Sequence, residues 1–370
     1  MTIIMVKIIQ DPVFGPIKAD GVILDLIDSP EFQRLRRIKN LGLCSLVFPG
    51  ANHTRFEHSI GTYYLASLYN EHLRTMSDEL KIAALLHDIG HFPYSHTIEE
   101  FYMETEKIDH LQAGINLIEG KAESEIPAIL EKHGIDPHWV SSILKGISNV
   151  LSEIISGPLD ADELDYLRRD SFYCGVSIGY VNPLRIIDVS SVYEGQIVSE
   201  EKGLSDIESL LISRFLMYQA VYFHKTCRIA NKMLGIAARL AEAIGTSRMV
   251  DEELMALLLS KKRSERIARD IINRRLMKVI FKEKYGEELY RDITDRIGED
   301  AIVDVIPPLS FSGRERLKTD VSVKIQGRIV AGEEISPLVN SLNQAIERRY
   351  VYVYGYKEDE EKIKSDLRGL

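Results

Sequence analysis

Residues 53–59, HTRFEHS, and residues 85–96, LLHDIGHFPYSH, decide how this chain folds. Each stretch places a histidine on a predicted helix, His58 in the first and His87 in the second, where Asp88 follows it directly. Because His87 comes after the apolar run IAALL, its helix is largely buried where the polar pair begins. A buried His–Asp pair is costly unless another group compensates it. The two stretches therefore predict a site that holds a charged group.

A divalent metal ion is the group that fits these side chains. Asp162, on a predicted helix over 160–170, adds a second carboxylate to His58, His87 and Asp88. Two imidazoles and two carboxylates suit a transition metal such as Mn, Fe, Co or Zn better than calcium. Open coordination positions would hold a water molecule and a phosphate oxygen. The alternative is that the histidines are ordinary core or surface side chains with no ligand.

The helix that carries Asp162 has an unusual polar face. Asp162, Asp165, Tyr166 and Arg169 are spaced i, i+3, i+4 and i+7, which places them on one side of the helix. Apolar residues usually occupy such a face and turn it toward a core. Here the pattern favours the wall of a polar pocket, the alternative being a solvated stripe.

Further histidines follow the helix break at Gly90. The segment that follows the break would aim His91 and His96 at a phosphate beside the metal, where they would offset charge or donate a proton. Glu99 would orient His96 or raise its pKa. His110 is a third candidate, and each of these residues has a structural or surface role as its alternative.

A basic and aromatic face is expected on the helix after residue 205. Arg214, Tyr218, Tyr222 and Lys225 share one side by their spacing. Such a face would bind phosphates and stack on a base. Simple packing with an extended lysine is the alternative interpretation.

Composition and charge limit the classes of function. The 370 residues carry 46 Lys+Arg against 56 Asp+Glu, a net charge of −10, which disfavours extended nucleic-acid binding. The basic segment 261–278 is predicted to be a solvated helix, with a subunit contact or an anion-binding surface as alternatives. No apolar run is long enough to span a membrane, and the first residues lack the pattern of a signal peptide. Three scattered cysteines indicate free thiols in a reducing cytoplasm.

The predicted fold is mainly α. A helical body over residues 1–300 carries short β-hairpins, one of them within 6–27 and one within 185–200 that turns at Glu194-Gly195. A helix is expected from Pro30 to Gly42, and the segment 251–298 is expected to be helical throughout. Residues 301–370 are predicted to form a small α+β lobe.

The motifs together resemble the HD-domain phosphohydrolase superfamily, and within it the deoxynucleoside triphosphate (dNTP) triphosphohydrolase branch. Besides the two opening stretches, the resemblance rests on IQDPVFG at 9–15, FQRLRRIK at 32–39 and LDADELDYLRRD at 159–170. It implies a helical fold and attack of water on the α-phosphorus of a dNTP, releasing deoxynucleoside and triphosphate. It also implies one divalent ion (Mn, Fe, Co, Ni, Zn or Mg), a second Mg²⁺ carried by the nucleotide, a homo-oligomer (dimer or tetramer) and an activating guanine nucleotide.

The resemblance also implies roles for individual residues. The metal ligands would be His58, His87, Asp88 and Asp162. The catalytic groups would be His91, His96, Glu99 and His110, and the substrate would contact Arg55, Tyr166, Asp170, Arg214 and Tyr222. The activating nucleotide would contact Lys7, Asp28, Gln33 and Arg36.

Two residues depart from the pattern of this branch. Glu163 stands where the nucleotide-activated dNTPase of animals, a member of this branch, has a phosphate-contacting lysine, and a carboxylate there would repel a triphosphate unless a second cation intervenes. Asn40 stands where that enzyme has a glutamine that contacts the sugar. Two alternatives therefore remain: an HD phosphohydrolase for a nucleoside monophosphate, cyclic dinucleotide or other phosphoester, or a non-catalytic protein that binds nucleotides or nucleic acid.

Overall fold

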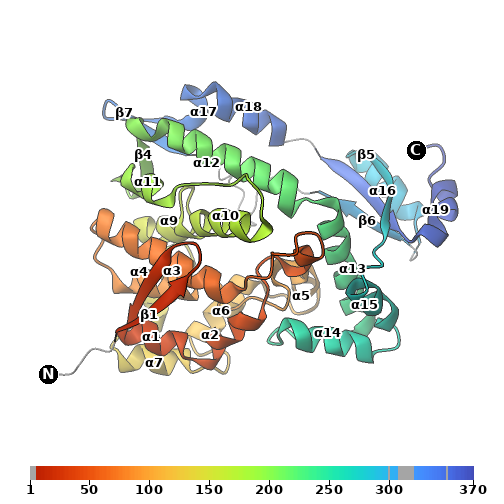
Figure 1. Ribbon diagram of the computed structural model, residues 1–370, viewed down its shortest axis with the longest axis horizontal. Coiled ribbons are helices and arrows are strands. Elements are labelled where there is room, and N and C mark those ends of the chain that lie inside the picture. Colours follow the sequence, from red (N-terminus) through yellow and green to blue (C-terminus); the bar gives the residue numbers. More distant parts are fainter. Residues whose placement is uncertain (1–5, 299–300, 307–320, 347–348) are drawn as a thin grey trace.

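The protein is mainly helical, as predicted (Figure 1). The computed structural model describes residues 6–298, 301–306, 321–346 and 349–370. No helix among the described residues is long and apolar enough to cross a membrane.

Fifteen α-helices lie between residues 21 and 272. They are α1 (Gly21–Ile27), α2 (Pro30–Arg34), α3 (Arg55–His72), α4 (Asp78–Leu86), α5 (Glu99–Thr105), α6 (His110–Ile118), α7 (Ile126–Lys132), α8 (Pro137–Leu144), α9 (Asn149–Ser156), α10 (Ala161–Cys174), α11 (Pro183–Asp188), α12 (Leu204–Met217), α13 (Lys225–Ala241), α14 (Asp251–Ser260) and α15 (Glu265–Ile272). A π-helical turn at Tyr218–Tyr222 follows α12.

The strands form three small sheets. In the first, β1 (Val6–Asp11) pairs antiparallel with β2 (Gly15–Asp20). The second has the order β3 (Ser190–Tyr193), β4 (Gln196–Glu200), β7 (Ser322–Ile325) and β8 (Arg328–Ala331), with β4 and β7 parallel. In the third, β9 (Tyr350–Gly355) lies between β5 (Lys278–Lys284) and β6 (Ala301–Val305), antiparallel to both. The C-terminal helices are α16 (Glu287–Arg296), α17 (Gly332–Ile335), α18 (Pro337–Ile346) and α19 (Glu360–Asp366).

The largest hydrophobic core lies around α3, which packs against α4 and α10. Each of these helices begins at a residue that satisfies its first backbone N–H groups. The Glu57 carboxylate accepts from the Thr54 backbone N–H at the start of α3, Ser77 Oγ accepts from Leu80 N–H in α4, and Asp160 accepts from Glu163 N–H in α10. The helix starts are therefore fixed, and the first turns of α3 and α10 carry His58 and Asp162, whereas His87 and Asp88 follow the end of α4.

A second core joins α5 to the helices α13, α14 and α15. It extends to Ile302 in β6 and Tyr354 in β9, so the C-terminal sheet packs against this side of the helical part. In Figure 1 the sheets separate: β5 and β6 lie beside α16 and α19, whereas β7 lies with α17 and α18 along α12. The division of the chain at residue 300 stays a prediction.

The structure confirms one predicted hairpin and corrects the extent of two predicted helices. The hairpin turn at Glu194-Gly195 is confirmed: both residues have positive φ, at 49° and 80°, as tight hairpins require. The continuous helix over 251–298 is wrong, because 278–284 forms β5, whose partner β9 lies about 70 residues farther along the chain. The helix from Pro30 to Gly42 is also wrong beyond Arg34, where 3₁₀ turns follow and the Arg34 guanidinium bonds to backbone carbonyls of residues 91, 248 and 249.

Candidate metal centre and active site

Four polar side chains from three helices meet at one point. His58 Nε2 lies 3.1 Å from Asp162 Oδ1, 3.4 Å from Asp88 Oδ2 and 3.2 Å from His87 Nε2. His87 Nε2 lies 3.4 Å from Asp88 Oδ1 and 3.8 Å from Asp162 Oδ1. These are the four residues expected from the sequence to bind a metal, and ligand atoms of His58, His87 and Asp88 all lie within 4.8 Å of one another, close enough together to hold one ion. Their role as ligands stays a prediction.

Local structure explains how the four groups converge. His58 lies one turn into α3, and His87 and Asp88 form the turn that ends α4. Asp162 is in the first turn of α10, which packs against α3. His58, His87 and Asp88 are buried, whereas the Asp162 side chain is 30% exposed. The centre is therefore closed on the helix side and open at Asp162.

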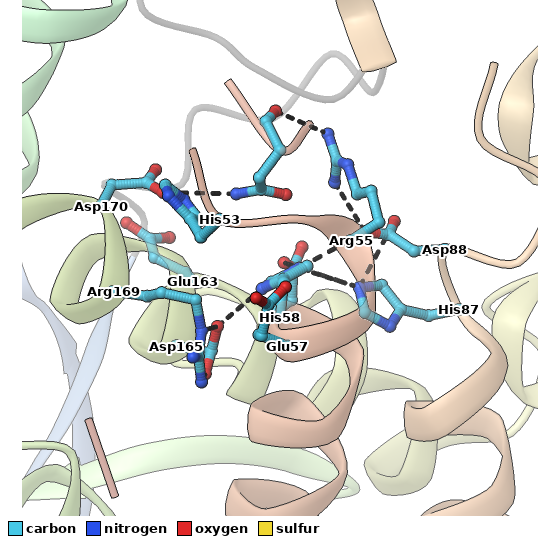
Figure 2. A network of polar contacts seen from close by, with 12 residues as sticks. His53, Arg55, Glu57, His58, His87, Asp88, Glu163, Asp165, Arg169 and Asp170 are labelled. Carbon is cyan, nitrogen blue, oxygen red and sulfur yellow. Dashed lines mark hydrogen bonds and ion pairs between the residues drawn. The ribbon is translucent and has the colours of Figure 1, made fainter. Parts of the chain in front are cut away.

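The imidazole orientations fit a metal ion. His58 Nδ1 lies 2.7 Å from Asp165 Oδ2, and His87 Nδ1 lies 2.8 Å from the Ala84 carbonyl oxygen. Both partners accept, so each Nδ1 donates and each Nε2 is directed at the other residues of the centre. Burial lowers the pKa of His58, but the hydrogen bonds to Asp162 and Asp165 outweigh this effect and raise the pKa to about 10, so binding of a metal ion at Nε2 would release a proton. The two Nε2 atoms lie 3.2 Å apart, and Figure 2 shows the His58 and His87 rings turned toward each other. Metal-binding histidines typically have this arrangement, with the distal nitrogen bonded to a carboxylate or a carbonyl.

A buried ion network stands behind His58. Asp165 accepts from Nε and Nη2 of Arg169, at 2.9 and 2.8 Å, and Arg169 Nη1 donates to Asp11 at 2.8 Å. A Cβ on Gly61 would lie 1.8 Å from Asp165 Oδ1, so only glycine leaves room for this network in α3. Asp165 and Arg169 belong to the polar face that the sequence indicated. These two residues support His58 instead of lining a pocket, whereas Asp162 of the same face lies at the open side of the centre. The contribution of Asp11 was missed.

Arg55 sets the charge next to the centre. Its Nη1 donates to Asp88 Oδ2 at 2.6 Å and its Nε donates to Ser95 Oγ at 2.9 Å, within the protein interior. Burial alone would raise the pKa of Asp88, but the charges of Arg55 and His87 outweigh this effect and hold the pKa well below its usual value. Asp88 is therefore a carboxylate, the form that a metal ion binds.

The remaining histidines and Glu99 form a second cluster against Asp88. His91 Nε2 lies 3.2 Å from Asp88 Oδ1, and the His91 ring stacks on His110 at 4.2 Å. Glu99 contacts Nδ1 of His96, at 2.7 Å, and Nδ1 of His110. Burial lowers the pKa of His110, but the hydrogen bond to Glu99 outweighs it and raises this pKa above its usual value.

A close backbone contact makes this cluster possible. A Cβ on Gly90 would lie 2.1 Å from Gly114 N and 2.2 Å from the His110 carbonyl oxygen. The turn after Asp88 therefore touches α6 directly, which brings His110 to His91.

Asp170 gathers the residues expected around the sugar. Its Oδ1 accepts from His53 Nε2 at 2.7 Å and from Asn40 Nδ2 at 3.2 Å, and its Oδ2 accepts from the Tyr222 hydroxyl at 2.7 Å. The Tyr222 ring lies 6.1 Å from that of Tyr166. The sequence analysis assigned no role to His53, the first residue of HTRFEHS, and its contact with Asp170 was missed.

Arg214 lies next to the centre in an ion pair with Glu163. Arg214 Nε is 3.1 Å from Glu163 Oε1, and both side chains are buried. The carboxylate that departs from the pattern of the dNTP branch therefore faces a cation.

The residues expected to bind an activating nucleotide lie near the N-terminal hairpin. Lys7 Nζ is 3.3 Å from Asp28 Oδ2, an exposed pair, and Arg36 Nε donates to Gln33 Oε1 at 2.9 Å. Gln33 also donates to the carbonyl oxygen of Ile27, next to Asp28. The four residues are close together in two pairs, and their role stays a prediction.

The sequence matches two family descriptions that follow one another along the chain. The HD domain matches residues 55–167, and the HD associated region matches residues 181–369, just over half of the chain. The deoxynucleoside triphosphate triphosphohydrolase SAMHD1 homolog of Dictyostelium discoideum is 31% identical over 258 residues, which are 62% of this chain and 48% of that protein. The chain spans about half the length of the curated relatives it matches.

Two solved structures are similar over nearly the whole chain. A hypothetical protein from Aquifex aeolicus has a TM-score of 0.83 and 32% identity, with 98% of this chain and 100% of that chain covered. A phosphohydrolase from Bacteroides thetaiotaomicron has a TM-score of 0.78 and 28% identity, covering 95% and 100%. The arrangement of His58, His87 and Asp88 agrees with the two family matches, with these structures and with the likeness to SAMHD1 proteins. The chain therefore belongs to the HD-domain phosphohydrolase superfamily, in its dNTP triphosphohydrolase-like branch.

Proposed function

We propose that this protein is a metal-dependent dNTP triphosphohydrolase, which releases a deoxynucleoside and inorganic triphosphate. The convergence of His58, His87, Asp88 and Asp162 within 3.1 to 3.8 Å carries the proposal. The named activity of the SAMHD1 relatives supports the choice of substrate.

The four side chains would hold one divalent ion, with Asp165 and the Ala84 carbonyl keeping each imidazole turned toward it. A bound ion of this kind lowers the pKa of a water molecule and polarises a phosphoryl oxygen. Arg55 brings a positive charge beside Asp88, where it offsets the charge of a phosphate. A second Mg²⁺ would enter with the nucleotide.

His96 is the proposed proton donor to the leaving oxygen. Its side chain is 61% exposed, so a substrate can reach it, and its Nδ1 is bonded to Glu99. The pKa of His96 is lowered from its usual value, mainly because packing in the cluster removes solvent from the ring, and the negative charge of Glu99 opposes this shift by stabilising the protonated imidazole. His91 and His110 lie between this pair and Asp88, and they extend the donor surface toward the phosphate.

The sugar would bind at Asp170, Tyr222 and Tyr166, and Arg214 would contact the phosphates. Asp170 accepts hydrogen bonds from three donors, and its two oxygens have room to accept one more from a hydroxyl group. The neighbouring rings of Tyr222 and Tyr166 would give an apolar surface for the sugar ring.

The direct test is turnover of each dNTP by the purified protein. The protein is incubated with Mn²⁺ or Mg²⁺ and each dNTP, alone and with GTP or dGTP, and the products are separated by anion-exchange chromatography. Deoxynucleoside with intact triphosphate is the expected result. The control is Asp88→Asn, which removes a proposed ligand. No turnover in any of these mixtures would contradict the proposal.

A second candidate is hydrolysis of a nucleoside monophosphate, cyclic dinucleotide or other phosphoester at the same site. The Glu163–Arg214 ion pair favours it, because a shorter anion meets less repulsion from the carboxylate. Product identity separates the candidates: inorganic phosphate or a linear dinucleotide indicates the second.

Activation by a guanine nucleotide and assembly into a homo-oligomer are part of the proposal. Lys7, Asp28, Gln33 and Arg36 would contact the activator. Light scattering with and without GTP measures the assembly, and a Lys7→Ala variant that responds to GTP like the native protein would remove this residue from the activator site.

A further inference from the structure

Glu163 and Arg214 form a buried ion pair at the turn of α10 that also carries Asp162 of the candidate metal centre. Glu163 follows Asp162 in the first turn of α10, and Arg214 lies in the last turn of α12. The side chains are 2% and 5% exposed, and Nε lies 3.1 Å from Oε1. The carboxylate therefore compensates the charge of the arginine where little water reaches it.

The Nη1 and Nη2 atoms of Arg214 lack the partner that Nε has in Glu163. Both Nη1 and Nη2 are buried, yet neither has a hydrogen-bond partner among the residues that the structure describes. Buried donors are nearly always satisfied, and an unsatisfied one is destabilising. A ligand with several acceptor oxygens would satisfy both, and phosphate matches the planar pair of donors of a guanidinium.

Glu163 also changes the charge that such a ligand meets. The Glu163–Arg214 pair has no net charge, so the guanidinium offers directed N–H groups with little net attraction for an anion. The carboxylate repels each further negative charge on the ligand, and this repulsion is strong where the dielectric constant is low. The effect is therefore larger for a triphosphate than for a single phosphate group.

We propose that Glu163 is a specificity-determining residue that limits the anionic charge accepted at this site. It neutralises Arg214 and leaves the Nη groups to donate to one phosphate group. The inference rests on the proposed function only in that the site takes a phosphate-bearing ligand. In the dNTP site, Glu163 weakens binding of the triphosphate tail relative to a single phosphate.

Binding of two inorganic anions tests this role without nucleotide turnover. Dissociation constants of phosphate and tripolyphosphate are measured by calorimetry for the metal-loaded native protein and for Glu163→Gln, with Mg²⁺ in excess of the chelating anion. The variant keeps the shape of the side chain and removes its charge. We expect tripolyphosphate to bind about tenfold more tightly to the variant, and phosphate to change clearly less.

The matched control is Asp304→Asn, which also removes a buried carboxylate from an arginine. Asp304 accepts from Arg228 Nε at 2.8 Å, in β6, and it lies outside the site. This variant is expected to melt at a lower temperature with native anion binding. Equal changes for both anions in Glu163→Gln, or no tighter binding of tripolyphosphate, would overturn the proposal.

If Glu163→Gln folds poorly, its melting temperature with and without tripolyphosphate still tests the proposal. Removing the carboxylate leaves Arg214 uncompensated, so the variant without ligand is expected to melt below the native protein. Tripolyphosphate should then raise its melting temperature more than that of the native protein, or restore a folding transition that is otherwise lost. Failure to do so would contradict the proposal. Absence of dNTP hydrolysis would leave this comparison intact, because neither anion is a substrate.

Discussion

Replacing Asp165 by asparagine tests how a residue that is not itself a proposed metal ligand contributes to metal binding through His58. Asp165 is fully buried, and it holds His58 Nδ1 at 2.7 Å while binding Arg169 through both oxygens. An asparagine keeps the shape but gives up the negative charge. Loss of such a carboxylate partner typically weakens metal binding by about 10- to 100-fold, or roughly 1.4 to 2.8 kcal/mol. Arg169 then has only Asp11 as a negatively charged partner, so we also expect a loss of about 3 kcal/mol in the free energy of unfolding.

Metal titration measures the first effect and chemical denaturation measures the second. The control is Asp11→Asn, because Asp11 also bonds to Arg169, at 2.8 Å, yet it makes no hydrogen bond to His58. It should lower the free energy of unfolding and leave metal affinity within a few-fold of the native value. Native metal affinity in folded Asp165→Asn would refute the view that this carboxylate supports a metal-binding imidazole.

Three further changes test other parts of the site. Gly61→Ala would place a Cβ 1.8 Å from Asp165 Oδ1, so it should lower both the melting temperature and metal content; unchanged values for both would contradict the close fit. His96→Ala should slow turnover of the substrate with metal content unchanged, and loss of the metal would show that its role is misassigned. Asp251 accepts from the Tyr94 backbone N–H, in the segment that carries His96. Burial raises the pKa of Asp251 to about 6. Between about pH 4 and 6 the folded protein therefore keeps a proton on Asp251 that the unfolded chain has lost. The contribution of Asp251 to native stability should fall by on the order of 2 to 3 kcal/mol as pH rises through this window, so the stability profiles of the native protein and Asp251→Asn should differ by that change; an identical pH profile for the variant would refute the assignment.

The sequence predicted the mainly helical fold and the residues that meet at the centre. The prediction worked because His87 and Asp88 follow an apolar run and Asp162 stands on a polar helix face, and buried polar groups of this kind need a common partner. The helix caps and turn residues around them act locally, so their effect is readable from neighbouring residues.

Contacts between distant residues were harder to predict. Asp11 and Arg169 are 158 positions apart, and only the packing of the β1–β2 hairpin near α10 brings them together. The same holds for β5, whose pairing with β9 decides between strand and helix. The expected repulsion by Glu163 could not be weighed from the sequence either, because Arg214 comes to it from another helix.

Metal content of the purified protein tests the central claim most directly. Elemental analysis should find one divalent ion per native chain and almost none in Asp88→Asn, with circular dichroism showing that both are folded. Equal metal content in the two proteins, or no metal bound by the native chain after loading with Mn²⁺, Fe²⁺ or Zn²⁺, would contradict a metal centre at His58, His87, Asp88 and Asp162.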